Sequence, residues 1–258
     1  METIIGHPLH LLASVDSTNN YAMEKIRTGQ ADHGTVYMAL EQTAGKGQRG
    51  KKWLAEPGSN IIMSVVLNTE RLTTDLQFLL SASIALGCCE FFKKYTGDEY
   101  PRIKWPNDIY WHDRKAGGIL IENRMQAGTS TEKWNWSVAG IGININQTTF
   151  QEEIAGQAVS LRQITGQSEN IHELVPQLCK ILNRRWEELS ALNSIRIMEE
   201  YNQNLYKRGE SVALKAREQF LQSQIIGVDA SGYLITRDMA DHRFAVGEVE
   251  WLRTPSNT

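Results

Sequence analysis

The sequence predicts an α+β protein, in which a mixed β-sheet flanked by helices is followed by a small domain built from strands alone. Three observations lead to this class. Residues 74–95 and 171–190 repeat apolar side chains at the three-four spacing of a helix. Apolar segments of strand length stand before and between these two helices. After Gly209 the helical spacing stops, and about fifty residues of short strands and turns suit a small β-barrel.

The first strands and the first helix follow from apolar runs and turn residues. Residues 9–15 (LHLLASV) read as a strand, after which Asp16 or Ser17 can cap a helix that ends at Gly29. Strands follow at 35–42 (TVYMALEQ) and 60–67 (NIIMSVVL), on either side of a loop rich in glycine and cations. The second of these strands is apolar enough to be buried on both faces.

The middle of the chain predicts a β-meander between the two long helices. Helix 74–95 is expected to be amphipathic, with Cys88 on its buried stripe. Four strands follow it, separated by turns at PND and HDRK, and their expected ranges are 102–105, 109–112, 117–122 and 136–145.

The C-terminal part is expected to hold strands at 211–216 (SVALKA), 224–230 (QIIGVDA), 233–238 (YLITRD) and 244–252 (FAVGEVEWL). The change of character places a domain boundary near Tyr206–Gly209, which divides the chain into residues 1–207 and 208–258. Because no flexible linker lies between the two parts, we expect them to pack directly.

Composition and charge exclude several classes of protein. Of the 258 residues, 41% are hydrophobic and 22% charged, as in an ordinary folded protein, and a net charge of −3 does not suit a general binder of polyanions. The three cysteines show neither a disulfide framework nor metal-ligand spacing, which indicates a reducing cytosol. The N-terminus lacks a secretory signal, and the stretch LLSASIALGCCEFF is too short and too polar to span a bilayer. We therefore expect a cytoplasmic protein.

The loop GKGQRGKKW, residues 45–53, matches a phosphate-binding P-loop only in its spacing. Lys52 stands where a P-loop needs Ser or Thr for magnesium, and Pro57 and Gly58 prevent the long helix that should follow. Sequence context therefore rejects the P-loop. The glycines and cations can instead surround a phosphate or carboxylate, although a solvated connection between strands explains this loop equally well when it is taken alone.

Two motifs of the meander carry charged side chains. KWPND makes a hairpin turn, but it also offers Lys104 to counter a phosphate, and Asn107 and Asp108 to reach a nucleotide or its magnesium. Lys115 precedes Ala116–Gly117–Gly118. These small residues either leave room for a ligand beside the ammonium group or only mark where a strand meets solvent.

Two further motifs carry neutral polar groups. GIGININ alternates with period two, so that Ile141, Ile143 and Ile145 share one face, and the other face, with Gly142, Asn144 and Asn146, suits a ligand lying against the sheet. DSTNNYA offers Ser17, Thr18 and Asn19 at a helix start. Capping explains one of the three, and the others either decorate the surface or bind a neutral group such as a urea or amide.

Taken together and in this order, these motifs resemble those of the biotin protein ligase family. The resemblance rests on DSTN, EQTAGKGQRG, Trp53, KWPND, DRKAGGIL and GIGIN, and it covers about Ser14 to Asn146. It implies the biotin/lipoate ligase-like fold for the main domain and, more loosely, an SH3-like β-barrel after Gly209.

The resemblance implies a two-step ATP-dependent reaction. The enzymes of this family join biotin to ATP, giving biotinyl-5′-AMP and pyrophosphate, and then pass the biotin to one lysine of a biotin carboxyl carrier protein or domain of a carboxylase. In the first step a carboxylate attacks a phosphate, so positioned cations and Mg²⁺ are needed to offset the repulsion of the two anions. ATP and biotin are thus the expected substrates.

The resemblance also implies roles for single residues. The positions matched to biotin binding are Ser17, Thr18, Asn19, Gln42, Gly47, Lys115, Gly118, Leu120, Gly140 and Gly142. The positions matched to nucleotide binding are Lys46, Gln48, Arg49, Trp53, Lys104, Asn107, Asp108 and Asn144. The expected catalytic residues are Lys115, Arg49 and Lys46. Mg²⁺ is expected to be held mainly by the ATP phosphates, with Asp108 as the candidate protein ligand, and Arg253 resembles a C-terminal-domain arginine of the family.

Partners and alternatives follow from the same comparison. Only about fifteen residues precede Ser17, too few for the helix-turn-helix that some members carry, so we expect a monofunctional ligase that binds neither DNA nor membrane. The oligomeric state stays open, with a homodimer among the alternatives. A lipoate- or octanoate-attaching enzyme of the same fold is the nearest rival, and KWPND and the β-rich C-terminal part favour biotin over it. A nucleic-acid-binding module is the rival from another class, and the net charge argues against it.

The loop departs from the family's usual G-R-G-R-x-G. Lys46 replaces the first arginine, and Gln48 replaces the second, with Arg49 directly after it. Because glutamine cannot reproduce the bidentate geometry of arginine, we expect Arg49 to make the phosphate contact, so that Arg49→Ala slows adenylate formation more than Gln48→Ala does. Pyrophosphate-release kinetics measure both variants, and equal or reversed effects contradict this assignment.

Overall fold

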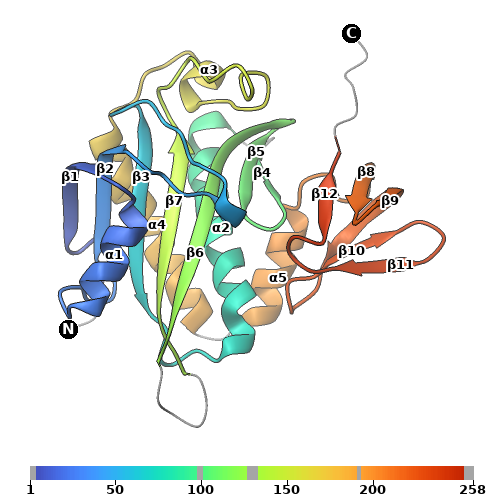
Figure 1. Cartoon of the computed structure of the whole chain (residues 1–258), viewed down its shortest axis with the longest axis horizontal. Coiled ribbons are helices and arrows are strands. Elements are labelled where there is room, and N and C mark those ends of the chain that lie inside the picture. The colour runs from blue at the N-terminus through green and yellow to red at the C-terminus, as the bar shows by residue number, and fades with distance from the viewer. Residues whose placement is uncertain (1–3, 98–100, 127–132, 191–192, 253–258) are drawn as a thin grey trace.

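The computed structural model describes residues 4–97, 101–126, 133–190 and 193–252. Its larger sheet has seven strands in the order β1-β2-β3-β7-β6-β5-β4 (Figure 1). The strands are β1 (Leu9–Val15), β2 (Val36–Gln42), β3 (Asn60–Asn68), β4 (Pro101–Lys104), β5 (Asp108–Trp111), β6 (Arg114–Gln126) and β7 (Lys133–Asn144). β1 and β2 are parallel and the other neighbours antiparallel, which confirms both the mixed sheet and the meander of β4 to β7.

Helices cover both faces of this sheet. The helix α1 (Thr18–Arg27) packs on one face, where Ala22 and Ile26 meet Val66 and Val138. The long helices α2 (Gln77–Thr96) and α4 (Ile171–Ser190) lie on the other face (Figure 1). β3 is an inner strand, between β2 and β7, and is buried along nearly its whole length, as its apolar sequence predicts.

The short helices were not foreseen. The helix α3 (Leu161–Thr165) has five residues, too few to show a period, and the 3₁₀ turn Gln48–Gly50 is shorter still. The 3₁₀ turn Thr74–Leu76 lies inside the predicted helix 74–95 and leads into α2. The helix α5 (Ser194–Gln203) buries only Ile197, Met198 and Tyr201. Its four apolar residues, one of them the exposed Ile195, give a weak helical signal, and tertiary packing against α2 and the second sheet completes the helix.

The helix α2 is more apolar than an amphipathic helix. Its buried residues run almost all the way round and include Ala82, Leu86 and Cys89 outside the predicted stripe. Together with the preceding 3₁₀ turn it spans 23 residues, and by length and composition alone it could cross a membrane, contrary to our estimate from the sequence. Its position between the sheet, α4 and α5 accounts for this composition. Cys88, Cys89 and Cys179 are buried free thiols, as their spacing predicted.

The smaller sheet contains five strands in the order β11-β10-β9-β8-β12. They are β8 (Ser211–Ala216), β9 (Gln219–Val228), β10 (Leu234–Arg237), β11 (Asp241–Phe244) and β12 (Val249–Trp251). The predicted single strand 244–252 is wrong. A turn closed by the bond from Glu248 N to Ala245 O splits it, with Gly247 at φ 93°, so that β11 pairs with β10 and β12 with β8.

The two sheets pack directly, as the lack of a linker predicted. The indole nitrogen of Trp105, in the β4–β5 turn, donates to Gly232 O at 3.0 Å. The Asn202 amide accepts from Val228 N at 2.7 Å and donates to Val228 O at 2.9 Å, replacing the bonds of a neighbouring strand. One hydrophobic core runs through both sheets. The boundary at residue 207 stays a prediction.

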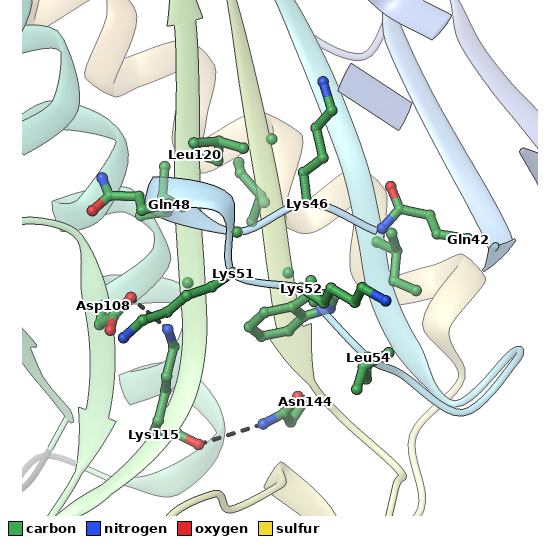
Figure 2. A pocket seen from close by; sticks show the side chains of 18 of the residues that line it. Gln42, Lys46, Gln48, Lys51, Lys52, Leu54, Asp108, Lys115, Leu120 and Asn144 are labelled. Atoms are coloured by element: carbon green, nitrogen blue, oxygen red, sulfur yellow. Dashed lines mark hydrogen bonds and ion pairs between the residues drawn. The ribbon is translucent and has the colours of Figure 1, made fainter. Parts of the chain in front are cut away.

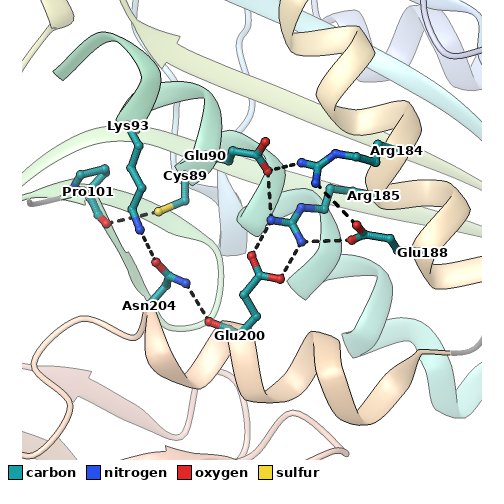
Figure 3. A network of polar contacts seen from close by, with 9 residues as sticks. All are labelled: Cys89, Glu90, Lys93, Pro101, Arg184, Arg185, Glu188, Glu200 and Asn204. Carbon is teal, nitrogen blue, oxygen red and sulfur yellow. Dashed lines mark hydrogen bonds and ion pairs between the residues drawn. The ribbon is translucent and has the colours of Figure 1, made fainter. Parts of the chain in front are cut away.

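A buried arginine ties the helices together. Arg185 of α4 is 6% exposed and binds both carboxylate oxygens of Glu200 on α5, at 2.5 and 2.7 Å. The same guanidinium reaches Glu90 of α2 at 3.0 Å and Glu188 at 3.1 Å (Figure 3). Three helices that the hydrophobic core alone would hold loosely are thereby fixed in register.

We expect Arg185→Ala to lower the free energy of unfolding by about 2–3 kcal/mol, because it leaves a cluster of carboxylates without its cation. Hydrogen bonding to Arg185 lowers the pKa of Glu200 below its ordinary value of 4.5. The stability from this pair is therefore complete above that value and is lost as the pH falls through the lower folded pKa. Urea unfolding near neutral pH and below pH 4.5 should show that the variant has lost this part of the acid sensitivity.

The matched control is Arg184→Ala. Arg184 precedes Arg185 and also faces Glu90 and Glu188, but its side chain is 48% exposed. We expect a change below about 1 kcal/mol, as for surface ion pairs. Equal losses of unfolding free energy in the two variants would show that the burial of Arg185 does not increase its contribution to stability.

Candidate active site

A cavity of about 380 Å³ opens on the α1 face of the large sheet, between β6, β7, the start of α1 and the glycine-cation loop. Nearly all the predicted site residues meet here. Those that line it are Ser17, Thr18, Asn19, Gln42, Lys46, Gly47, Gln48, Arg49, Trp53, Asp108, Lys115, Gly118, Leu120, Gly140, Gly142 and Asn144.

The start of α1 supplies buried polar groups. Ser17, Thr18 and Asn19 are each at most 3% exposed, so none of them decorates the surface. Both the backbone N–H and the hydroxyl of Thr18 donate to Gln42 Oε1, at 2.8 and 3.0 Å. These two donors fix the Gln42 amide, whose Nε2 is left to donate. The Thr18 oxygen is left to accept.

Asn19 is held by three bonds. Its Nδ2 donates to Leu120 O at 3.2 Å and to Glu122 Oε2 at 2.8 Å, and its Oδ1 accepts from Ser64 at 2.6 Å. Both N–H groups of the amide are thus used by the protein, and one lone pair of Oδ1 is left. Asn19 therefore offers the cavity an acceptor.

The floor of the cavity is a strand face without side chains. Ile141 and Ile143 of β7, with Ile145 just beyond it, point into the core, as the period of two predicted. Gly140 and Gly142 point the other way. A Cβ atom on Gly140 would collide with Asn19 Oδ1, and one on Gly142 would lie 2.5 Å from the Trp53 ring. Glycine at these positions lets both side chains lie against the sheet.

Lys115 stands at the centre of the cavity with its backbone firmly held. Its N–H donates to Gln157 O at 2.6 Å, and its carbonyl accepts from Val159 N at 2.9 Å and from Asn144 Nδ2 at 3.4 Å. Its ammonium lies 2.7 Å from Asp108 Oδ1 and 5.7 Å from the centre of the Trp53 ring (Figure 2). A cation, a carboxylate and an aromatic face thus meet at one point.

The loop adds further cations to the lining. Lys51 is directed toward the side of the cavity that holds Lys115 and Asp108, whereas Lys46 is directed away from it (Figure 2). Arg49 has φ 56° and ψ 39°, and its guanidinium lies so close to Gly247 that a Cβ there would be 2.9 Å away. The lining holds one carboxylate, Asp108, and five cationic side chains, which are Lys46, Arg49, Lys51, Lys52 and Lys115. The cavity therefore favours anions within an acidic chain.

The family profile described as "Biotin/lipoate A/B protein ligase family" matches residues 11–144, more than half of the chain. The chain belongs to this family. It is similar to the "Bifunctional ligase/repressor BirA" of Escherichia coli, with 31% identity over 182 residues, which is 70% of this chain and 54% of that protein. The chain thus spans about half the length of the first curated relatives that it matches.

Two other family members match along nearly their whole length. The "Biotin--[acetyl-CoA-carboxylase] ligase" of Paracoccus denitrificans is 28% identical over 239 residues, covering 89% of this chain and 94% of that protein. Among solved structures, the "Biotin protein ligase from Aquifex aeolicus in complex with biotin and ATP" superposes with a TM-score of 0.76 at 25% identity, covering 98% of this chain and all of that one. The shared fold extends over both sheets.

Two predicted residues of the family motif KWPND lie outside the cavity lining. The Lys104 ammonium lies over the rings of Tyr110, Tyr206 and Trp251, 4.8 to 5.9 Å from their centres, between the two sheets. Asn107 is buried, and its amide donates to Ile119 O. Both side chains brace the hairpin that carries Asp108. Arg253 lies outside the described residues.

Residues 150–158 form a wall of the cavity that sequence reasoning missed. Phe150, Gln151, Ile154, Gln157 and Ala158 line it, and the segment pairs with the backbone of Lys115 through Ala158. This segment has no regular period. The available sequence signal was two large apolar residues, Phe150 and Ile154, in a polar stretch.

The residues present fit a metal ion that arrives with a nucleotide. Among the described residues, no three His, Cys, Asp or Glu side chains gather to hold a metal. Asp108 is the carboxylate in the lining, and one or two carboxylates together with substrate phosphates are the usual ligands of Mg²⁺.

We expect Gly142→Ala to lower the free energy of unfolding by about 1–3 kcal/mol, because the new methyl group displaces Trp53 from the sheet. The control is Gly156→Ala, where a Cβ atom meets nothing within 4 Å. That variant should stay within about 0.5 kcal/mol of the parent. Urea unfolding measures both, and equal values would contradict the close packing of Trp53 on Gly142.

Proposed function

We propose that this chain is an ATP-dependent biotin protein ligase, which makes biotinyl-5′-AMP and then transfers biotin to one lysine of a biotin carboxyl carrier domain. The names of the relatives support the substrate class, since one is a ligase of acetyl-CoA carboxylase and one solved neighbour holds biotin and ATP. The chemistry of the cavity supports it independently.

The observation that carries this proposal is the hydrogen-bond pattern at the start of α1. Thr18 and Asn19 offer acceptors and Gln42 Nε2 offers donors, all beside the bare strand face of Gly140. The ureido ring of biotin needs this combination, since it has two N–H groups and one carbonyl. The dithiolane ring of lipoate has neither, so lipoate would leave these buried groups unpaired, at a cost of about 1–3 kcal/mol each.

Lys115 supports the first chemical step. A carboxylate oxygen of biotin attacks the α-phosphorus of ATP, the bond to the bridging oxygen breaks, and pyrophosphate leaves. The ammonium of Lys115, held 2.7 Å from Asp108, can turn from that carboxylate to the substrate anions, which have the same charge. It thereby offsets the repulsion between carboxylate and phosphate and stabilises the crowded phosphorus centre.

The loop cations and Mg²⁺ serve the leaving group. Arg49 and Lys51 line the cavity and suit the negative charge that moves onto pyrophosphate. Mg²⁺ would be held by the ATP phosphates with Asp108 as protein ligand, and it would neutralise phosphate charge. Trp53 and the wall at 150–158 exclude water from the reactive anhydride, which must survive until the carrier arrives.

In the second step the amine of a carrier lysine attacks the acyl carbon of biotinyl-5′-AMP. AMP leaves with the bonding electron pair, and the amide nitrogen loses its proton. This step asks the protein for little beyond positioning, because the mixed anhydride is already activated. A biotin carboxyl carrier domain is therefore the proposed partner.

Incubation with biotin, Mg-ATP and a purified carrier domain, followed by mass spectrometry, tests the proposal. We expect one biotin adduct on the carrier, reduced at least about a hundredfold for Lys115→Ala, in line with the loss of one preorganised cation. Isothermal titration with biotin and with lipoate tests the ligand class. Binding of lipoate alone would overturn the assignment in favour of a lipoate-attaching enzyme.

A further inference from the structure

We infer that Glu122 is a positioning residue, which orients the Asn19 amide so that its oxygen, and not its nitrogen, faces the ligand. Glu122 also anchors the glycine-cation loop through Lys46. The inference rests on the proposed function, since it concerns recognition of the ureido ring. Glu122 lies on β6, two residues beyond Leu120 and on the same side of the strand, and its side chain is 33% exposed.

The first argument concerns the amide of Asn19. Its Nδ2 meets two groups that can only accept, the Glu122 carboxylate at 2.8 Å and the Leu120 carbonyl at 3.2 Å. If the amide turned over, its oxygen would face these two oxygens, and both contacts would become repulsive. Without the carboxylate, one carbonyl and one Ser64 hydroxyl remain, and a hydroxyl can either donate or accept. Glu122 is thus the charged group that keeps Asn19 Oδ1 on the ligand side.

The consequence is that Asn19 recognises an N–H group of the ligand. With both its N–H groups taken, Asn19 can only accept from a ligand, through the remaining lone pair beside Gly140. A ligand that offers a second acceptor or a methyl group there gains no bond and leaves a buried oxygen unpaired. Glu122 therefore acts on specificity without touching the ligand.

The second argument concerns the loop. The other carboxylate oxygen of Glu122 lies 3.6 Å from the ammonium of Lys46, which also donates to Asn20 Oδ1. Lys46 is directed away from Lys115 (Figure 2), and its ion pair with Glu122 and its bond to Asn20 hold it there. Glu122 therefore contacts both Asn19, which faces the ureido ring, and Lys46, the first cation of the glycine-cation loop.

Steady-state kinetics of Glu122→Ala and Glu122→Gln test the inference. For Glu122→Ala we expect the KM for biotin to rise about tenfold, the fold-change for losing one hydrogen bond to a charged group, while kcat stays within about twofold. Glu122→Gln keeps an oxygen that can accept from Asn19, so its KM should lie within about threefold of the parent value. Glu70→Ala, on an exposed turn, is the matched control and should change neither constant.

Two biotin analogues, each methylated on a different ureido nitrogen, distinguish a loss of Asn19 orientation from a general loosening of the fold. The parent should prefer biotin over at least one of them, and Glu122→Ala should reduce that preference at least about threefold, because its Asn19 amide is free to turn. If Glu122→Ala only loosened the fold, it would weaken the binding of biotin and of both analogues equally. That result would overturn the inference, and so would an unchanged KM for biotin. If the parent itself neither binds biotin nor forms an adenylate, the proposed function fails instead.

Discussion

Two glycines of β7 have no room for a Cβ atom, and the cavity exists because of this. On one face of the strand, isoleucines fill the core beneath α2 and α4, so β7 cannot move. On the other face, Gly140 and Gly142 leave a bare backbone, against which Asn19 and Trp53 lie. Helix, loop and sheet therefore meet at van der Waals distance, and Asn19 and Trp53 are placed against the same strand face.

Charge in this molecule is local rather than global. The chain is acidic overall, yet the cavity lining holds five cationic side chains and a single carboxylate. Lys115 and Asp108 are paired, which keeps the ammonium in place at little cost because both side chains are about one-third exposed. The ratio of charges is reversed between the helices, far from the cavity. There one cation, Arg185, binds three carboxylates.

Much of the fold and site could be predicted from sequence because the informative segments are locally determined. The strands of the meander and the alternation of Ile141, Gly142 and Ile143 follow from period and turn chemistry alone. The failures depend on contacts between distant segments. The helix α5 forms because of its tertiary packing, and strand pairing on each side of Gly247 divides the chain into β11 and β12. Segment 150–158 is held in place by its backbone bonds to Lys115. Lys46 lines the cavity, but its ammonium is held by Glu122 and Asn20, two distant contacts that the sequence does not indicate.

The contact between Arg49 and Gly247 joins the two sheets through the loop. Lys46, near one end of the loop, rests on β6, while Arg49, in its middle, rests on the turn between β11 and β12. The loop is thus supported from both sheets. A side chain larger than hydrogen at position 247 would push on the guanidinium directly. The small sheet, which contributes no residue to the lining, therefore still supports the loop that lines the cavity.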